Sequence, residues 1–251
     1  MSNSYSYKTI KPASSISDFV DSYWSFQNGL DNDIERIIVP DGRIDLLLSK
    51  SPMEPFDIAI NGLETKPKRL PYHPNSTVFA ISFKLLAVEY LLQEPFANLL
   101  DTKKILPEDF WDYEETDLRD FEVFVTKTER KIESLLNKEI DHRKQVLFGL
   151  IYASNGEKGV QELSETSHWS SRQINRYFNQ QFGLPLKKYL MILRFGASLQ
   201  HLSVGKLFPE LDFSDQAHFI RNVRKLSGVP PKALSKNLND RFIQLSVLQK
   251  R

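Results

Sequence analysis

The segment 170–182 alternates apolar and polar residues with the period of an α-helix. Its apolar positions share one helical face: Ile174, Tyr177, Phe178 and Phe182. Ser170 can cap the start of this helix, and Gly183 suits a left-handed C-cap at its end. The wider segment 160–182 therefore predicts two helices around a tight turn, of which the second buries its aromatic face against the first.

The same unit occurs a second time in the chain. Residues 170–188 read SSRQINRYFNQQFGLPLKK, and residues 215–233, forty-five positions later, read DQAHFIRNVRKLSGVPPKA. The identical pairs at this offset are Arg176 and Arg221, Gly183 and Gly228, Pro185 and Pro230, and Lys187 and Lys232. Apolar positions recur as well, since Ile174 and Phe178 correspond to Phe219 and Val223. A longer helix, at about 186–202, is expected to join the two copies.

Two helices around a tight turn are the layout of a helix-turn-helix, whose second helix enters the major groove of DNA. The polar face of the first copy carries Arg172, Asn175, Arg176 and Asn179. Arg can bond guanine with two hydrogen bonds, and Asn can do the same with adenine. One such pattern is common in ordinary helical domains, but two joined by a long helix can reach successive turns of DNA, about 34 Å apart. The repeat therefore predicts binding to double-stranded DNA.

Both copies resemble the DNA-binding domain of AraC/XylS-type bacterial transcription regulators. The resemblance covers about residues 145–236 and is carried by ELSETSHWSSRQINRYFNQQFGLPLKKYL and by FSDQAHFIRNVRKLSGVPPKAL. The second stretch matches the family pattern at Phe213, Ser214, Asp215, Gln216, His218, Phe219, Arg221, Gly228 and Pro230. It implies an all-α DNA-binding domain at 141–251, with helix-turn-helix units at about 160–183 and 204–228.

Carried over position by position, the resemblance implies DNA contacts from both units. These residues are Ser171, Arg172, Gln173, Asn175 and Arg176 in the first unit, and Gln216, His218 and Arg221 in the second. The second unit departs from the family pattern, because Asp212 stands where Gly is expected and Pro209 leaves its first helix short or starting at the proline. Ala217 and Ile220 on its reading surface cannot donate hydrogen bonds. This unit therefore either reads bases or mainly scaffolds and grips phosphate.

Strands are expected in the first half of the chain. ERIIVPDGRIDLLLSK contains two β-branched runs around the turn signal Pro40-Asp41-Gly42, which predicts a β-hairpin. FDIAINGL at 56–63 and STVFAISFKL at 76–85 predict further strands.

Helices are expected among these strands. LAVEYLLQEPFANLLD predicts a helix broken near Pro95, and apolar positions from 118 to about 140 predict an amphipathic helix. That second helix either packs within the domain or pairs two subunits. The fold class is therefore an α+β N-terminal domain at 1–140, followed by the double helix-turn-helix domain.

Several stretches of the first half also look like the domain that precedes this DNA-binding type in some bacterial regulators: WSF, VPDGRIDLLL, NGLETKPKRL, VFAISFKLLAVEYLL and KILPEDFW. This implies a β-rich, sensor-like domain, related in role to the cupin-like effector domains of the family. Trp24, Phe26, Arg43 and Lys84 are candidates for a pocket in which a cation meets an acidic ligand. The alternative is that the aromatic residues are core and the cations are solvated.

Charge is divided unevenly along the 251 residues. Residues 1–140 hold 16 Lys and Arg against 24 Asp and Glu, which gives −8, and residues 141–251 hold 17 against 8, which gives +9. A basic domain often meets nucleic acid, because it neutralises phosphates and releases counterions. The alternative is a basic surface without a partner. The acidic run at 108–122 is interpreted as a solvated face.

Composition excludes several chemistries. The chain has no cysteine, which rules out disulfides, thiolate metal sites and a cysteine nucleophile. His73 is the only histidine before His142, so a multi-histidine metal site of cupin type cannot be built in the first domain. No motif of a hydrolase, a phosphate-binding loop or a metalloprotease occurs. We expect neither an enzyme nor a cofactor, and a cytoplasmic location.

The sequence thus predicts a sequence-specific transcription regulator that is controlled through its N-terminal domain. A small-molecule effector, a second copy of the chain and RNA polymerase are further candidate partners. The alternative is an interaction protein whose second helix-turn-helix is degenerate and whose specific DNA binding is weak or lost.

Overall fold

The computed structural model describes residues 5–136, 139–208 and 215–249. Their contacts divide the chain into two compact units. Unit 1 contains residues 1–34, 43–62 and 71–140, and unit 2 contains residues 35–42, 63–70 and 141–251. A β-rich first half followed by helices confirms the expected fold class. Two short segments of the first half, however, belong to the helical unit.

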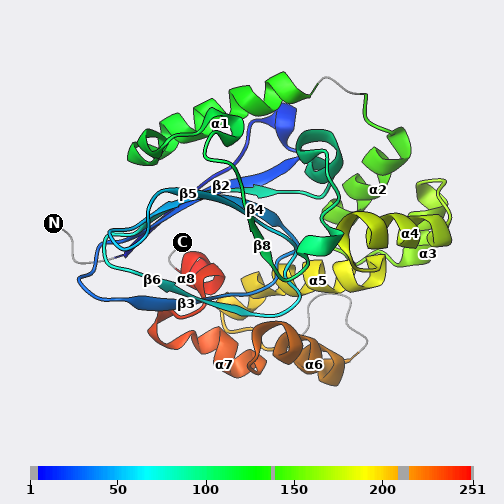
Figure 1. Cartoon of the computed structure of the whole chain (residues 1–251). Helices are drawn as coiled ribbons and strands as arrows, with labels where there is room; N and C mark the ends of the chain where they lie inside the picture. Colours follow the sequence, from blue (N-terminus) through cyan, green and yellow to red (C-terminus); the bar gives the residue numbers. More distant parts are fainter. Residues whose placement is uncertain (1–4, 137–138, 209–214, 250–251) are drawn as a thin grey trace. The chain divides into compact units, whose positions relative to one another are not determined.

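Unit 1 is built on a six-stranded sheet (Figure 1). In spatial order its strands are β1 (Tyr5–Ile10), β2 (Val20–Asn28), β7 (Thr77–Phe83), β4 (Ile44–Lys50), β5 (Asp57–Asn61) and β8 (Lys103–Ile105). Every neighbouring pair is antiparallel, and Ala80 of β7 lies opposite both Trp24 of β2 and Leu47 of β4. The runs predicted as strands at 56–63 and 76–85 form β5 and β7.

One face of this sheet is covered by α1 (Phe121–Leu135), as Figure 1 shows. The side chain of Asp120 accepts two N–H groups of the first turn and so caps the helix. Phe79 of β7 contacts the rings of Phe121 and Phe124, with centroid distances of 5.1 and 5.5 Å. The amphipathic helix predicted for this segment is therefore confirmed, and its apolar face lies on the sheet.

Short helical turns connect the elements of unit 1. They are η1 (Ser14–Ile16), the π-helix η2 (Val88–Leu92), and the 3-10 turns η3 (Ala97–Leu99), η4 (Phe110–Asp112) and η5 (Glu115–Arg119). The helix expected around Pro95 exists only as η2 and η3. Gln93 ends η2 in a left-handed conformation with φ 57°, and Pro95 has no N–H with which to continue a helix.

The predicted hairpin around Pro40-Asp41-Gly42 is wrong. β3 (Ile34–Ile38) pairs with β6 (Lys68–Tyr72) in a separate two-stranded sheet, whereas β4 joins the six-stranded sheet. The chain bends at Gly42, whose φ of +80° favours glycine. The N–H groups of Ile37 and Val39 donate to Arg241 and Gln244, so they have partners other than a hairpin neighbour. The tripeptide therefore connects strands of two different sheets.

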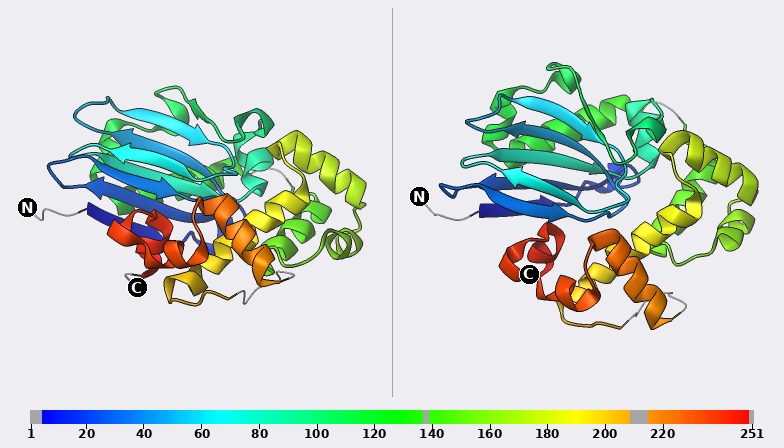
Figure 2. Two further views of the ribbon diagram at one scale, coloured as in Figure 1. Left: turned by 90° about the horizontal axis from the view of Figure 1, so that it is seen from below. Right: turned by 60° about the horizontal axis from the view of Figure 1, so that its bottom comes forward.

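Unit 2 consists mainly of helices. They are α2 (His142–Ala153), α3 (Val160–Thr166), α4 (Ser171–Phe182), α5 (Leu186–Ser203), α6 (Gln216–Ser227), α7 (Pro231–Lys236) and α8 (Ile243–Gln249), with the 3-10 turn η6 (Leu238–Asp240) before α8. The helix expected at about 186–202 is α5, and Figure 2 shows α6 and α7 beside it. Among the described residues, no helix is both long and apolar enough to span a membrane.

The segment 35–42 is bonded to two of these helices within unit 2. The Ile37 N–H donates to the carbonyl of Arg241 just before α8, at 2.6 Å. Gln244 of α8 accepts the Val39 N–H at 3.3 Å and donates to the Val39 carbonyl at 2.9 Å. The carbonyl of Gly42 accepts the hydroxyl of a tyrosine on α5. The segment is thus held at both ends by the helical unit.

Candidate nucleic-acid interface

α3 and α4 form the first helix-turn-helix, and caps fix the turn between them. The Ser170 hydroxyl accepts the Gln173 N–H at 3.4 Å, and the Gln173 side-chain carbonyl accepts the Ser170 N–H at 3.2 Å. This capping box satisfies N–H groups that a helix start leaves open. In the turn, His168 adopts a left-handed φ of 52°. The N-cap predicted at Ser170 is confirmed.

The inner face of α4 fixes its rotation in the unit. Its predicted apolar residues are all buried: Ile174, Tyr177, Phe178 and Phe182. Phe148 of α2 lies against Phe178 and Phe182, with ring centroids 5.8 and 6.2 Å away, and Trp169 contacts Tyr177 at 5.1 Å. Aromatic pairs of this kind add about 0.5–1.5 kcal/mol each beyond burial. The residues on the opposite face of α4 therefore point away from a well-packed core.

The outer face of α4 presents two arginines. Arg172 and Arg176 are exposed and four residues apart, so they lie on one side of the helix. Within the part of the chain that the structure describes, neither guanidinium makes a hydrogen bond or an ion pair. Gln173 is exposed beside them, although its carbonyl serves the cap, and Ser171 is half-buried. Both guanidinium groups are therefore available to bind an external acceptor.

The side chain of Asn175 is hydrogen-bonded within the fold at both of its polar atoms. Its amide nitrogen donates to the carbonyl of Ser171 at 3.0 Å, and its carbonyl oxygen accepts the N–H of Leu186 at 3.2 Å. The residue is half-buried. Both polar atoms are thus engaged within the fold, which distinguishes Asn175 from the neighbouring arginines.

α6 reproduces α4 at an offset of forty-five residues. Both helices have twelve residues and both end at a glycine in the left-handed conformation, with φ 75° at Gly183 and 77° at Gly228. The Asp215 carboxylate takes the place of the Ser170 hydroxyl and accepts the His218 N–H at 2.7 Å. The sequence repeat is therefore a structural repeat from N-cap to C-cap.

The outer surface of α6 offers fewer groups that can read bases. Gln216, Ala217 and Arg221 are exposed, whereas His218 and Ile220 are half-buried. Two cations that the sequence analysis left out, Arg224 and Lys225, are exposed in the last turn of the helix. The sequence did offer a signal for them, because two adjacent basic residues precede the C-cap glycine, Gly228, by a few positions. Residues 209–214, with the expected interruption at Pro209 and the departure at Asp212, lie outside the described residues.

The N-cap of α6, Asp215, also carries a negative charge at the start of the helix. The hydrogen bond from the His218 N–H holds the pKa of Asp215 below its usual range, and the charge of Arg221 lowers it further. Asp215 is therefore ionised near neutral pH. A carboxylate at this position also complements the positive end of the helix dipole.

Two of the four candidate ligand residues lie in the core of unit 1. Phe26 is fully buried, with its ring between Tyr5 at 5.9 Å and Tyr72 at 4.3 Å. Trp24 is buried to 9% exposure, stacks on Tyr7 at 6.0 Å, and donates its indole N–H to Ser82 at 3.2 Å. These contacts give both aromatic residues a packing role.

The other two candidates, Arg43 and Lys84, gather around Asp21. The Arg43 guanidinium is 2.9 Å from the Asp21 carboxylate, and the Lys84 ammonium donates to the Ser17 carbonyl at 2.6 Å. Burial opposes ionisation of Asp21, but the charges of Arg43 and Lys11 outweigh it and lower its pKa. Burial lowers the pKa of Lys84. The structure thus brings Arg43 and Lys84 together around the carboxylate of Asp21. Trp24 and Phe26 lie further along β2 and are not part of this cluster.

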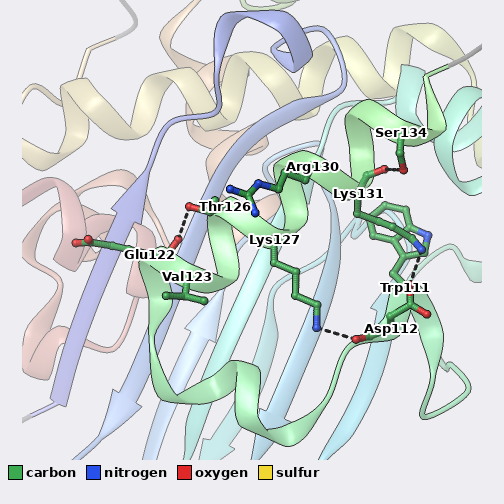
Figure 3. Close-up of a pocket in the computed structure, with 9 residues that line it drawn as sticks. All are labelled: Trp111, Asp112, Glu122, Val123, Thr126, Lys127, Arg130, Lys131 and Ser134. Carbon is green, nitrogen blue, oxygen red and sulfur yellow. Dashed lines mark hydrogen bonds and ion pairs between the residues drawn. The ribbon is translucent and has the colours of Figure 1, made fainter.

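A groove of about 560 Å³ lies along α1 (Figure 3). Two of its lysines turn toward Asp112, since the Lys131 ammonium is 2.7 Å from the carboxylate and the Lys127 ammonium is 2.7 Å from the backbone carbonyl. The hydrogen bond from Lys131 lowers the pKa of Asp112. Within the described residues, no three His, Asp or Glu side chains gather as metal ligands. Both lysines of the groove are therefore already paired inside unit 1.

Comparison with known families assigns the repeat region. Residues 163–237, which run from α3 to the end of α7, match the helix-turn-helix domain family. This segment is an AraC-type helix-turn-helix domain. Residues 8–104, which hold the sheet of unit 1, match a family described as a domain of unknown function, DUF6597. The helix α8 follows the AraC-type segment and lies outside both matches.

Solved structures of ToxT from Vibrio cholerae align with most of the chain. One at 1.65 Å resolution is 14% identical, covers 94% of this chain and 99% of its own, and has a TM-score of 0.43. ToxT bound to an unsaturated fatty acid is 12% identical, covers 95% and 96%, and has a TM-score of 0.42. ToxT bound to (E)-4-(8-methylnaphthalen-1-yl)but-3-enoic acid is 13% identical, covers 96% and 99%, and also has a TM-score of 0.42. No curated protein matches the sequence.

Proposed function

We propose that this protein is a sequence-specific DNA-binding transcription regulator, with a DNA-binding domain at 141–251 and a regulatory domain at 1–140. The observation that carries the proposal is the repeated recognition helix. α4 and α6 lie forty-five residues apart, have the same length, and have side-chain N-caps and glycine C-caps at equivalent positions. Each also exposes an arginine at the same position, Arg176 and Arg221. Two such helices joined by α5 are suited to successive major grooves on one side of a duplex.

Charge favours the same partner. Residues 141–251 carry a net charge of +9, although the chain as a whole carries +1. Each phosphate that a cation neutralises releases counterions, so binding to DNA weakens steeply as salt rises. A regulator needs no catalytic group, and we propose no enzymatic activity and no cofactor.

The two units are proposed to divide the work. In the first unit, Arg172 and Arg176 read bases, because their guanidinium groups are exposed and make no bond within the described residues. Ser171 and Gln173, at the start of α4, contact the sugar-phosphate backbone of the DNA. In the second, a set of exposed or half-exposed groups mainly positions the duplex through phosphate: Gln216, His218, Arg221, Arg224 and Lys225. Ala217 and Ile220 favour this division, since neither can donate a hydrogen bond to a base.

Control through the N-terminal half is the second part of the proposal. The segment 35–42 belongs to unit 2 and is hydrogen-bonded to α5 and to α8. It continues at Arg43 into the sheet of unit 1, so a ligand or a second copy bound to that sheet could act on the helices through the chain itself. A small-molecule effector, a homodimer, contact with RNA polymerase and a cytoplasmic location belong to this proposal.

The proposal is tested by measuring how the full-length protein binds a random-sequence duplex. Fluorescence anisotropy at two salt concentrations gives the affinity. We expect binding at low salt and a steep loss of affinity as salt rises, with a slope that reports the number of phosphates contacted. The Arg172→Ala, Arg176→Ala double variant should bind more weakly. If the wild-type protein does not bind at low salt, the chain is better described as an interaction protein with a degenerate helix-turn-helix.

A further inference from the structure

One side chain of the first recognition helix bonds the start of the joining helix, in addition to the ring contact of Phe178 with Tyr189 at 5.7 Å. Leu186 is the first residue of α5, and its N–H has no acceptor within that helix. Pro185, the N-cap, supplies no side-chain hydrogen bond. The acceptor comes instead from α4, because the side-chain carbonyl of Asn175 accepts the Leu186 N–H at 3.2 Å. Asn175 thus caps a helix other than its own.

The opposite end of the same amide is also fixed. Its nitrogen donates to the carbonyl of Ser171, one turn earlier in α4, at 3.0 Å. The amide therefore cannot rotate without breaking a bond on one side or the other. It lies between Arg172 and Arg176 in the sequence, so the bond to α5 is made in the same turn that carries both arginines.

The second unit replaces both partners of this bond. At the offset of forty-five residues, Asn175 corresponds to Ile220 and Leu186 corresponds to Pro231. Ile220 has no acceptor to offer, and Pro231, the first residue of α7, has no N–H to be accepted. Removing one partner of a buried hydrogen bond is costly, whereas replacing both partners with apolar groups can be nearly neutral. The paired change fits a position that joins two helices, and it would be a coincidence at a position that reads bases.

We propose that Asn175 is a positioning residue, which fixes α4 against the start of α5 and so aims Arg172 and Arg176, and that it does not read bases itself. The inference rests on the proposed DNA-binding function. Binding sites tolerate misplacement of only about half an ångström. A loss at this junction should therefore weaken binding to every sequence rather than relax the choice at one base pair.

Two substitutions at Asn175 separate positioning from base reading in the full-length protein. Asn175→Asp keeps an oxygen acceptor for the Leu186 N–H and places a negative charge at the start of α5, where it is favourable. It loses the amide donor that adenine recognition requires. Asn175→Ala loses both. Gln200→Ala is the control, because Gln200 carries an exposed amide on α5 and belongs to neither recognition helix.

The probe is the duplex that the wild-type protein selects from a random pool, together with a set of duplexes that change one base pair each. We expect Gln200→Ala to bind within about threefold of the wild type. Asn175→Asp loses the bond to Ser171 and adds a negative charge to the DNA-binding unit, so it should bind all duplexes more weakly. Base preferences should be unchanged in both variants. Asn175→Ala should weaken binding to all duplexes by about tenfold, the factor that corresponds to one lost hydrogen bond. Loss of preference at a single base pair in both Asn175 variants would overturn the inference.

Thermal unfolding of the same four proteins gives a readout that does not need DNA. Asn175→Ala should lower the melting temperature, and Asn175→Asp should lower it less. If Asn175→Ala melts like the wild type, the junction is not held by this side chain and the inference fails. If the wild-type protein selects no duplex, the proposed function fails, and the melting comparison still decides whether Asn175 joins the helices.

Discussion

Tyr189→Phe tests whether the segment 35–42 is held by the helices of unit 2. Tyr189 is fully buried on α5, and its hydroxyl donates to the carbonyl of Gly42 at 3.0 Å. The same hydroxyl lies 3.0 Å from that of Tyr152 on α2. The substitution removes one oxygen and leaves the ring, so it changes the hydrogen bonds with little change in packing.

The size of the effect follows from what is left behind. Without the hydroxyl, the Gly42 carbonyl loses this donor in a buried position, which costs about 1–3 kcal/mol. For a chain of this length, each kcal/mol shifts the melting temperature by about 2–4 °C. We therefore expect Tyr189→Phe to lower the melting temperature by about 2–12 °C.

Thermal unfolding by circular dichroism measures the shift, with Tyr152→Phe as the control. That control removes the bond between the two tyrosines but keeps the bond from Tyr189 to Gly42. It should cost clearly less, about 1 kcal/mol or below. Equal shifts for Tyr189→Phe and Tyr152→Phe would refute the reasoning, because the bond to Gly42 would then add nothing to stability.

Three further changes test other parts of the structure. Gly42→Ala should destabilise unit 2, because φ is +80° and the new Cβ would lie 2.8 Å from a Leu193 methyl; a variant as stable as the wild type in urea unfolding would contradict the close approach. The pKa of Asp215 is lowered by the His218 N–H bond, so its charge stabilises above the unfolded pKa, and this stabilisation is lost as pH falls through the folded one. Asp215→Asn keeps a capping oxygen, and the stability difference from the wild type should shrink in urea titrations as pH falls below about 4. Burial raises the pKa of both Tyr23 and Tyr113, so their neutral forms stabilise fully below about pH 10 and this contribution is lost as pH rises further. An absorbance titration should show tyrosines that ionise only on unfolding, and Tyr23→Phe should lower their number by one.

The elements that the sequence predicted well are those whose signals are local. The length of α4, its buried face, its cap at Ser170 and its end at Gly183 all follow from helical periodicity and from capping chemistry within about fifteen residues. The repeat then extended the same reading to α6. Position and type of these helices needed no information from the rest of the chain.

Long-range partners explain what the sequence did not predict. The letters around Gly42 indicate a turn, but they cannot say that Val39 bonds Gln244, 205 residues later, in place of a hairpin neighbour. Periodicity placed Asn175 on the outer face of α4, because a helical pattern carries no information about the N–H of Leu186 in the next helix. The sequence made Trp24 a candidate for a ligand pocket, and only its contacts with Tyr7 and Ser82 show its packing role.

Selection of the full-length protein on a random pool of duplex DNA tests the central claim most directly. The account predicts that the wild-type protein enriches one strongly specified half-site of about 4–6 base pairs beside a loosely specified one, a helical turn away. The Arg172→Ala, Arg176→Ala double variant should lose the strong half-site and keep weak, salt-sensitive binding. No enrichment by the wild-type protein, two equally specified half-sites, or a strong half-site that survives the double substitution would contradict the account.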